Sequence, residues 1–148
     1  AGGAARGAVL PLLDERPALL AVANRDVDKA AMLKTQFAPC GELTVGSFDA
    51  FRDGRFDLVV NATSASLGGE GLPLPAGLFA PGALAYDMAY GKEPTRFMAD
   101  ARRLGAARVA DGLGMLVAQA AEAFFLWRGV HPDTAPVLRM LQAGQEKP

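Results

Sequence analysis

Ala1-Gly2-Gly3-Ala4-Ala5-Arg6-Gly7 begins the chain and has the composition of a glycine-rich phosphate-binding turn that runs directly into a helix. In a dinucleotide-binding βαβ unit, a strand leads into such a turn, and the free N–H groups at the start of the following helix bind the pyrophosphate. Gly2 would let the backbone approach that group, while Gly3 and Ala4 would leave room for the helix to pack on the sheet. By itself the motif is equally compatible with an ordinary Gly/Ala-rich helix start. No strand precedes Ala1 in this sequence, so we expect the first strand of the sheet to be missing.

Short apolar segments alternate with helical segments along the rest of the chain. The pattern predicts strands at 18–23, 43–45, 57–61, 83–87 and 108–110, and helices at 3–15, 28–37, 93–104, 112–128 and 134–143. Residues 67–82 are rich in Gly and Pro and are predicted to form a loop. Pro11 is unfavourable inside the first predicted helix. The alternation predicts an α/β fold, a Rossmann-like doubly wound parallel sheet, with residues 1–148 forming a single domain.

The charge and hydrophobic patterning exclude several classes of partner. The 148 residues carry a net charge of −1, so no basic field is present to attract nucleic acid or an anionic membrane. The longest apolar stretch, residues 113–127, includes Gln119 and Glu122 and is too short to span a bilayer. We therefore expect no nucleic-acid partner and no membrane partner.

Cysteine and histidine are scarce in this sequence. Cys40 is the one cysteine, which rules out an internal disulfide and favours a reducing, cytoplasmic location. His131 is the one histidine, so a multi-histidine zinc site or a Ser-His-Asp triad is not expected. We predict no bound metal.

The end of the second strand of a dinucleotide-binding fold indicates which cofactor it prefers. NAD-binding domains usually have Asp or Glu there, which bonds the ribose 2′-OH. This chain has Asn24-Arg25, with Lys29 one helical turn later. A guanidinium and an ammonium suit a ribose 2′-phosphate, which favours NADP over the alternative of two solvated cations. Asp26 places a negative charge beside the proposed phosphate site.

Two polar turns follow neighbouring predicted strands, at the sheet edge where ligands bind in open α/β folds. Asn61-Ala62-Thr63-Ser64 has small polar groups that either contact a ligand or cap the turn. In Tyr86-Asp87-Met88-Ala89-Tyr90, the Met88 side chain could press on a flat nicotinamide, and the Tyr90 hydroxyl could reach a substrate oxygen. Core packing of Tyr86 and Met88 is the simpler alternative.

The last motif is Asp111-Gly112-Leu113-Gly114-Met115, at the start of a long apolar helix. Two glycines at a helix start are unfavourable for stability, which indicates that the backbone approaches another group closely there. Gln119 lies further along an otherwise apolar helix and needs a hydrogen-bond partner. That partner is either a neighbouring backbone group, which the helical spacing alone favours, or a ligand hydroxyl or carboxylate.

Taken in order, these motifs resemble the C-terminal, NADP-binding half of bacterial shikimate dehydrogenases over essentially the whole chain. The most specific part of the resemblance is the last motif, which continues through Leu116-Val117-Ala118-Gln119-Ala120 and Phe124-Phe125-Leu126-Trp127-Arg128-Gly129. The family commonly has Thr where this chain has Asp26. It often has Arg at the position of Lys29, so the charge is retained while the planar fork is lost.

The resemblance implies a role for each matched residue. The cofactor would contact the turn, the adenosine loop and the strand ends, and the substrate would contact two further side chains. The implied pyrophosphate residues are Ala1, Gly2, Gly3 and Ala4; the ribose-phosphate residues are Asn24, Arg25 and Lys29; the nicotinamide-side residues are Thr63, Ser64, Met88 and Gly112; and the substrate residues are Tyr90 and Gln119.

The resemblance also implies the activity, which is the reversible, NADP-dependent reduction of 3-dehydroshikimate to shikimate in chorismate and aromatic amino-acid biosynthesis. The family's catalytic Lys and Asp belong to an N-terminal substrate domain that nothing in this sequence matches. We therefore expect no catalytic residue in this chain, no activity of the chain alone, and contact between the terminal helices at about 112–144 and that missing domain. Whether the protein is a homodimer is not decided by the sequence.

Two other functions are compatible with the motifs. A quinate/shikimate dehydrogenase that uses NAD would share the fold, although Arg25 argues against NAD. A non-catalytic nucleotide-binding module would keep the glycine turn but would not need Tyr90 or Gln119.

Overall fold

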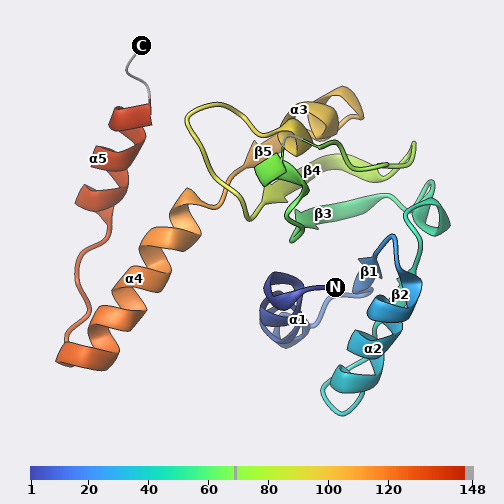
Figure 1. The fold of residues 1–148 in the computed structure, drawn as a ribbon, viewed down its shortest axis with the longest axis horizontal. Helices are drawn as coiled ribbons and strands as arrows, with labels where there is room; N and C mark the ends of the chain where they lie inside the picture. The colour runs from blue at the N-terminus through green and yellow to red at the C-terminus, as the bar shows by residue number, and fades with distance from the viewer. Residues whose placement is uncertain (69, 146–148) are drawn as a thin grey trace.

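The computed structural model describes residues 1–68 and 70–145, in which helices and strands alternate (Figure 1). The helices are α1 (Gly3–Asp14), α2 (Val27–Phe37), α3 (Arg96–Arg103), α4 (Leu113–Arg128) and α5 (Ala135–Gln145), and the strands are β1 (Ala21–Ala23), β2 (Thr44–Gly46), β3 (Phe56–Asn61), β4 (Phe79–Asp87) and β5 (Arg108–Ala110). Two short 3₁₀ helices, η1 (Asp49–Phe51) and η2 (Ala65–Gly68), flank β3. The predicted α/β class is confirmed.

Every strand pair is parallel, and the strands form two separate sheets. β1 pairs with β2, and β4 lies between β3 and β5 in the other sheet. Parallel pairing is confirmed, but the sheet is divided between β1 and β3.

Each sheet has its own apolar core. Phe97 and Ala101 of α3 pack with Ala83 and Ala85 of β4. On the other sheet, Val9 of α1 packs with buried side chains of α2 and of the segment before β2, which are Leu33, Phe37 and Leu43.

Most predicted elements are present, with shifted boundaries. The strand predicted at 18–23 is reduced to Ala21–Ala23, and β4 begins at Phe79, inside the predicted 67–82 loop. α1 continues through Pro11 to Asp14, because Val9 and Leu13 pack against the α2 core. α3 begins later than predicted, because the Thr95 side chain caps it by accepting a hydrogen bond from the Met98 N–H at 3.2 Å.

α4 and α5 pack against each other and extend away from the sheets (Figure 1). α4 ends at Gly129, whose φ of +70° is left-handed and whose N–H donates to the Phe125 carbonyl. Leu126 and Trp127 are 79% and 80% exposed, and Val137 and Met140 of α5 are also exposed. No helix within the described residues is both long and apolar enough to cross a membrane.

Candidate functional site

A groove of about 1270 Å³ runs along the carboxyl ends of β1, β3 and β4. Its volume exceeds the roughly 300–1,000 Å³ typical of small-ligand pockets. It brings together all of the predicted site residues except Gly112 and Gln119. The lining includes Ala1, Gly2, Gly3, Ala4, Asn24, Arg25, Lys29, Thr63, Ser64, Met88 and Tyr90.

The N-terminus of α1 opens into this groove. Gly2 is the N-cap, in extended conformation, and the first helical hydrogen bond runs from the Arg6 N–H to the Gly2 carbonyl at 3.0 Å. The N–H groups that precede Arg6 at this helix start have no intrahelical acceptor. A Cβ at Gly2 or Gly3 would meet no described atom within 4 Å, so the space in front of these backbone groups is open. This is the geometry of an anion site. The predicted close packing at Gly3 is not seen among the described residues.

The loop between β1 and α2 supplies the charged part of the groove. The Asn24 side-chain amide donates to the Asp26 carbonyl at 2.9 Å, which fixes the loop and leaves the Arg25 side chain exposed. Asp26 caps α2 through the Lys29 N–H, and its carboxylate also lies 3.4 Å from the Lys29 ammonium. Arg25 and Lys29 therefore face the groove together, with the Lys29 charge partly compensated by Asp26.

A buried carboxylate joins the turns after β3 and β4. Asp87 is fully buried and accepts hydrogen bonds from the Asn61 amide at 3.1 Å, the Thr95 hydroxyl at 2.6 Å and the Ala89 N–H at 3.0 Å. The Asn61 carbonyl also accepts the Met88 N–H at 3.0 Å. The bonds to Asn61 and Thr95 link the two turns and the start of α3, and the Ala89 bond closes the turn after β4, so this groove wall is preorganised.

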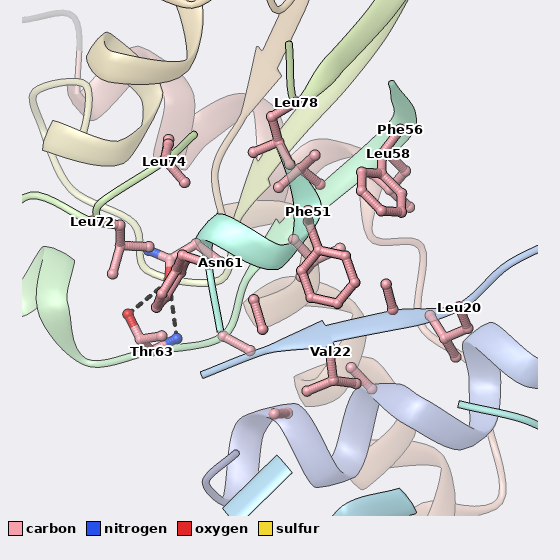
Figure 2. A pocket seen from close by; sticks show the side chains of 18 of the residues that line it. Leu20, Val22, Phe51, Phe56, Leu58, Asn61, Thr63, Leu72, Leu74 and Leu78 are labelled. Carbon is pink, nitrogen blue, oxygen red and sulfur yellow. Dashed lines mark hydrogen bonds between the residues drawn. The ribbon is translucent and has the colours of Figure 1, made fainter. Parts of the chain in front are cut away.

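Thr63 and Ser64 use their hydroxyl groups differently. The Thr63 N–H and hydroxyl both donate to the Asn61 side-chain oxygen, at 3.0 and 2.8 Å (Figure 2), and the Thr63 hydroxyl accepts the Ala65 N–H. Ser64 is exposed at the groove. The Thr63 hydroxyl therefore caps the turn, and both Thr63 and Ser64 line the groove, so their contact with a ligand stays a prediction.

Gly112 lies behind the groove wall. A Cβ at this position would overlap the Met88 carbonyl oxygen, and the Gly112 N–H donates to the Ala89 carbonyl at 3.0 Å. The close backbone approach predicted for this motif is therefore confirmed at Gly112, and the group approached is the Met88 backbone. Gly114 has no such neighbour within the described residues.

The two predicted substrate side chains differ in position. Tyr90 lines the groove and is 48% exposed. Gln119 is exposed on α4 and lies outside the groove lining, so its role stays a prediction.

Burial raises the pKa of the Tyr86 phenol, and the charges of Asp111 and Asp87 add to the effect, so this half-buried phenol remains neutral.

Some residues that line the groove were not predicted from the sequence. Phe48 and Met115 line it without having been predicted, as does Glu70. Met115 belongs to the quoted Gly-Leu-Gly-Met segment, whose helical start provided a signal. Phe48 precedes an unpredicted 3₁₀ helix, and its sequence context gave no signal of a groove residue.

A parallel α/β domain with an open helix N-terminus and adjacent cations at one sheet edge belongs to the class of nucleotide-binding domains. A family model described as the shikimate 5′-dehydrogenase C-terminal domain matches residues 112–142. The NADP(+) shikimate dehydrogenase of Dechloromonas aromatica (strain RCB) is 62% identical to this chain over 143 residues, which are 97% of this chain and 52% of that protein. The chain belongs to the shikimate dehydrogenase family, and it spans about half the length of the curated relatives it matches.

Solved structures support the same relationship. An Ael1 enzyme from Pseudomonas putida is similar at a TM-score of 0.86 and 51% identity, with 95% of this chain and 51% of that one covered. Shikimate 5-dehydrogenase from Thermus thermophilus, solved in complex with NADP(H) and shikimate, is similar at a TM-score of 0.70 and 32% identity, with 90% of this chain and 48% of that one covered.

Proposed function

We propose that this chain provides the NADP-binding half of an NADP-dependent shikimate dehydrogenase, which interconverts 3-dehydroshikimate and shikimate. The proposal is carried by one observation: an open helix N-terminus and the Arg25–Lys29 cation pair face the same groove. Two separate anionic groups of one ligand, a pyrophosphate and a ribose 2′-phosphate, match these two features. The names of the relatives, and the nucleotide and shikimate in the Thermus structure, point to the same ligands.

The residues present fit this cofactor. The backbone N–H groups that follow Gly2 would hold the pyrophosphate, and the open space at Gly2 and Gly3 admits it without a clash. Arg25 would hold the 2′-phosphate in a planar, charge-assisted contact. When bound, the reduced nicotinamide supplies the hydride for ketone reduction.

On the substrate side, this chain contributes orientation. Met88 would pack against the nicotinamide ring, and its backbone is fixed by the Asn61 carbonyl and by Gly112. The exposed Tyr90 hydroxyl would bond a substrate oxygen, with Gln119 as a second contact. Holding the nicotinamide ring and the substrate in the reactive geometry would raise the rate of hydride transfer.

The acid–base chemistry would come from a separate substrate domain, and we propose that the chain alone has no turnover. The exposed apolar residues of α4 and α5 support contact with such a domain, since Leu126, Trp127 and Met140 are large exposed apolar side chains on two helices that pack together. Val137 is exposed on the same helix as Met140, while Leu138 and Leu141 are half-buried. We also propose a cytoplasmic location, supported by the free thiol of Cys40.

One specific observation favours a second candidate, an NAD-dependent quinate/shikimate dehydrogenase. The Asp26 carboxylate lies 3.4 Å from the Lys29 ammonium, where it would oppose a phosphate and could accept a hydrogen bond from a ribose hydroxyl. Cofactor selectivity therefore separates the two candidates.

The test is calorimetric titration of the chain and its Arg25→Glu variant with NADP and with NAD. We expect the variant to bind NADP at least about tenfold more weakly, because a charge-assisted contact of about 1.5–3 kcal/mol is replaced by repulsion. Binding of NAD should change much less.

Arg108→Glu is the matched control, because Arg108 is an exposed arginine at the start of β5 and does not line the groove. It should leave both affinities unchanged. Equal losses of NADP and NAD binding in Arg25→Glu would contradict a 2′-phosphate contact, and tighter binding of NAD than NADP by the unmodified chain would favour the second candidate.

A further inference from the structure

Phe48 is a half-buried aromatic residue of the groove lining that has no role in the cofactor contacts described above. It follows β2 by two residues and is the N-cap residue of η1. Besides the groove, it lines an apolar cavity of about 170 Å³ between the two sheets. Phe48 therefore lies where the apolar interior of the protein meets the groove.

Short contacts around η1 fix the position of Phe48. The Phe51 N–H donates to the Phe48 carbonyl at 3.2 Å, and the Phe51 ring packs edge-on against the Phe56 ring of β3, with centroids 5.9 Å apart (Figure 2). A Cβ at Gly46 would lie 2.9 Å from the Ala50 Cβ, so the glycine that ends β2 allows η1 to fold back onto this strand. The groove edge at Phe48 is therefore preorganised.

Phe48 and Arg25 leave neighbouring strands at the same point of the sheet. Ala23 of β1 is paired with Gly46 of β2, and the Asn24 N–H donates to the Gly46 carbonyl at 3.2 Å. Each of the two groove residues follows its member of this pair by two positions. Because parallel strands lie about 4.8 Å apart, the two residues enter the groove side by side.

The covalent structure of the proposed cofactor connects these two residues. In NADP, adjacent carbon atoms of one ribose carry the 2′-phosphate and the adenine. A 2′-phosphate held by Arg25 therefore places the adenine within one ribose of this guanidinium, at the strand ends where Phe48 lies. Tyr90, the other aromatic residue among the described groove residues, follows β4 in the other sheet.

We propose that Phe48 is the platform on which the adenine of NADP stacks. The inference rests on the proposed function, from which it takes its ligand. A phenyl ring binds the flat face of a purine and leaves the polar edges of the base to water or other groups. Replacement of an aromatic platform by alanine weakens the binding of a stacked base by roughly fivefold to 100-fold. Phe48 would thus favour ligands that carry a base over simple phosphates.

The experiment measures the calorimetric dissociation constants of NADP and NAD for the chain and its Phe48→Ala variant. Both dinucleotides carry adenine, so we expect both to bind about fivefold or more weakly, and by the same factor. This pattern differs from that of Arg25→Glu, which is expected to act on NADP far more than on NAD. Phe124→Ala is the matched control, because Phe124 is a 43% exposed phenylalanine of α4 outside the groove lining.

Two further variants separate loss of the ring from loss of packing. Phe48→Leu keeps apolar bulk at the edge of the cavity but has no ring, and we expect it to weaken both dinucleotides by about threefold or more. Phe48→Tyr keeps the ring and should retain most of the affinity. If Phe48→Ala does not fold, this pair of variants carries the test.

A spectroscopic measurement reports the stacking itself. Adenosine 2′-phosphate is added to the chain, and the adenine H2 and H8 signals are followed by NMR. We expect upfield shifts from the ring current of Phe48, together with NOEs between the adenine and Phe48 ring protons. Both signatures should be lost in Phe48→Leu and kept in Phe124→Ala.

The outcomes distinguish this inference from the proposed function. If NADP does not bind to the unmodified chain, both are overturned. If NADP binds but Phe48→Ala and Phe48→Leu leave its affinity within about twofold, the inference alone fails. Weaker binding of NADP without weaker binding of NAD would also overturn it, because the residue would then act on the 2′-phosphate and not on the base.

Discussion

At the residue scale, Asp87 and Gly112 determine the shape of the groove although neither presents a side chain to it. Asp87 joins the turns after β3 and β4 by accepting hydrogen bonds from groups that include the Asn61 amide, the Ala89 N–H and the Thr95 hydroxyl. Gly112 lets the start of α4 meet the Met88 backbone. The position of Met88 beside the proposed nicotinamide is therefore set by residues behind the wall.

We predict that Gly112→Ala lowers the free energy of unfolding by about 1–3 kcal/mol, because a methyl group would overlap a backbone oxygen that no rotamer change can move. Gly114→Ala is the matched control. Its Cβ would meet open space in the same helix, and it should raise stability by about 0.5–1 kcal/mol. Urea unfolding of both variants checks this, and equal effects would contradict the close-approach explanation.

Much of the site is predictable from residue types and spacing. The glycine turn, Asn24-Arg25 and the two strand-end turns all meet in one groove, because parallel strands bring their carboxyl ends to a common edge. The hydrogen-bond partner of a side chain is less predictable. Thr63 lines the groove, and its hydroxyl donates to the Asn61 side-chain oxygen, which depends on a turn geometry that small polar residues adopt in several ways.

At the element scale, α2 is capped by the residue that also modulates charge in the groove. Asp26 accepts a hydrogen bond from the Lys29 N–H and pairs with the Lys29 ammonium. One carboxylate therefore stabilises the helix start and offsets a cation of the proposed phosphate site. Asp28, in the first turn of the same helix, is not the N-cap.

We predict that Asp26→Thr raises NADP affinity roughly fivefold, because it removes about 1 kcal/mol of repulsion from a nearby phosphate. Thr retains an N-cap oxygen, so stability should change little, whereas Asp26→Ala should cost about 1 kcal/mol of unfolding free energy. Calorimetric titration and urea unfolding measure the two effects. An unchanged NADP affinity in Asp26→Thr would mean that no phosphate binds beside Lys29.

Element boundaries were less predictable than element types. β4 begins at Phe79 because its first residues pack into the α3 core, although their sequence is interrupted by Pro81 and Gly82. β1 is shorter than its apolar run, since it pairs with β2 over three residues. In both cases tertiary contacts, which local composition does not contain, decided where the strand begins.

At the scale of the whole molecule, the gap between the two sheets lies next to the groove, and the two share lining residues. Ala1 lines both the apolar cavity of about 170 Å³ between the two sheets and the groove, where it lies at the start of the proposed pyrophosphate site. The exposed apolar residues of α4 and α5 leave a second surface for the proposed substrate domain.

The central claim is that one groove holds NADP along its whole length, from the α1 N-terminus to Met88. The most direct test is an NMR titration of the isotope-labelled chain with NADP, which follows the backbone amides of Gly2, Arg25, Ser64 and Met88. We predict that all four shift together with a single dissociation constant, while amides of α5 do not shift. Shifts confined to one end of the groove, or no shifts at saturating NADP, would contradict the claim.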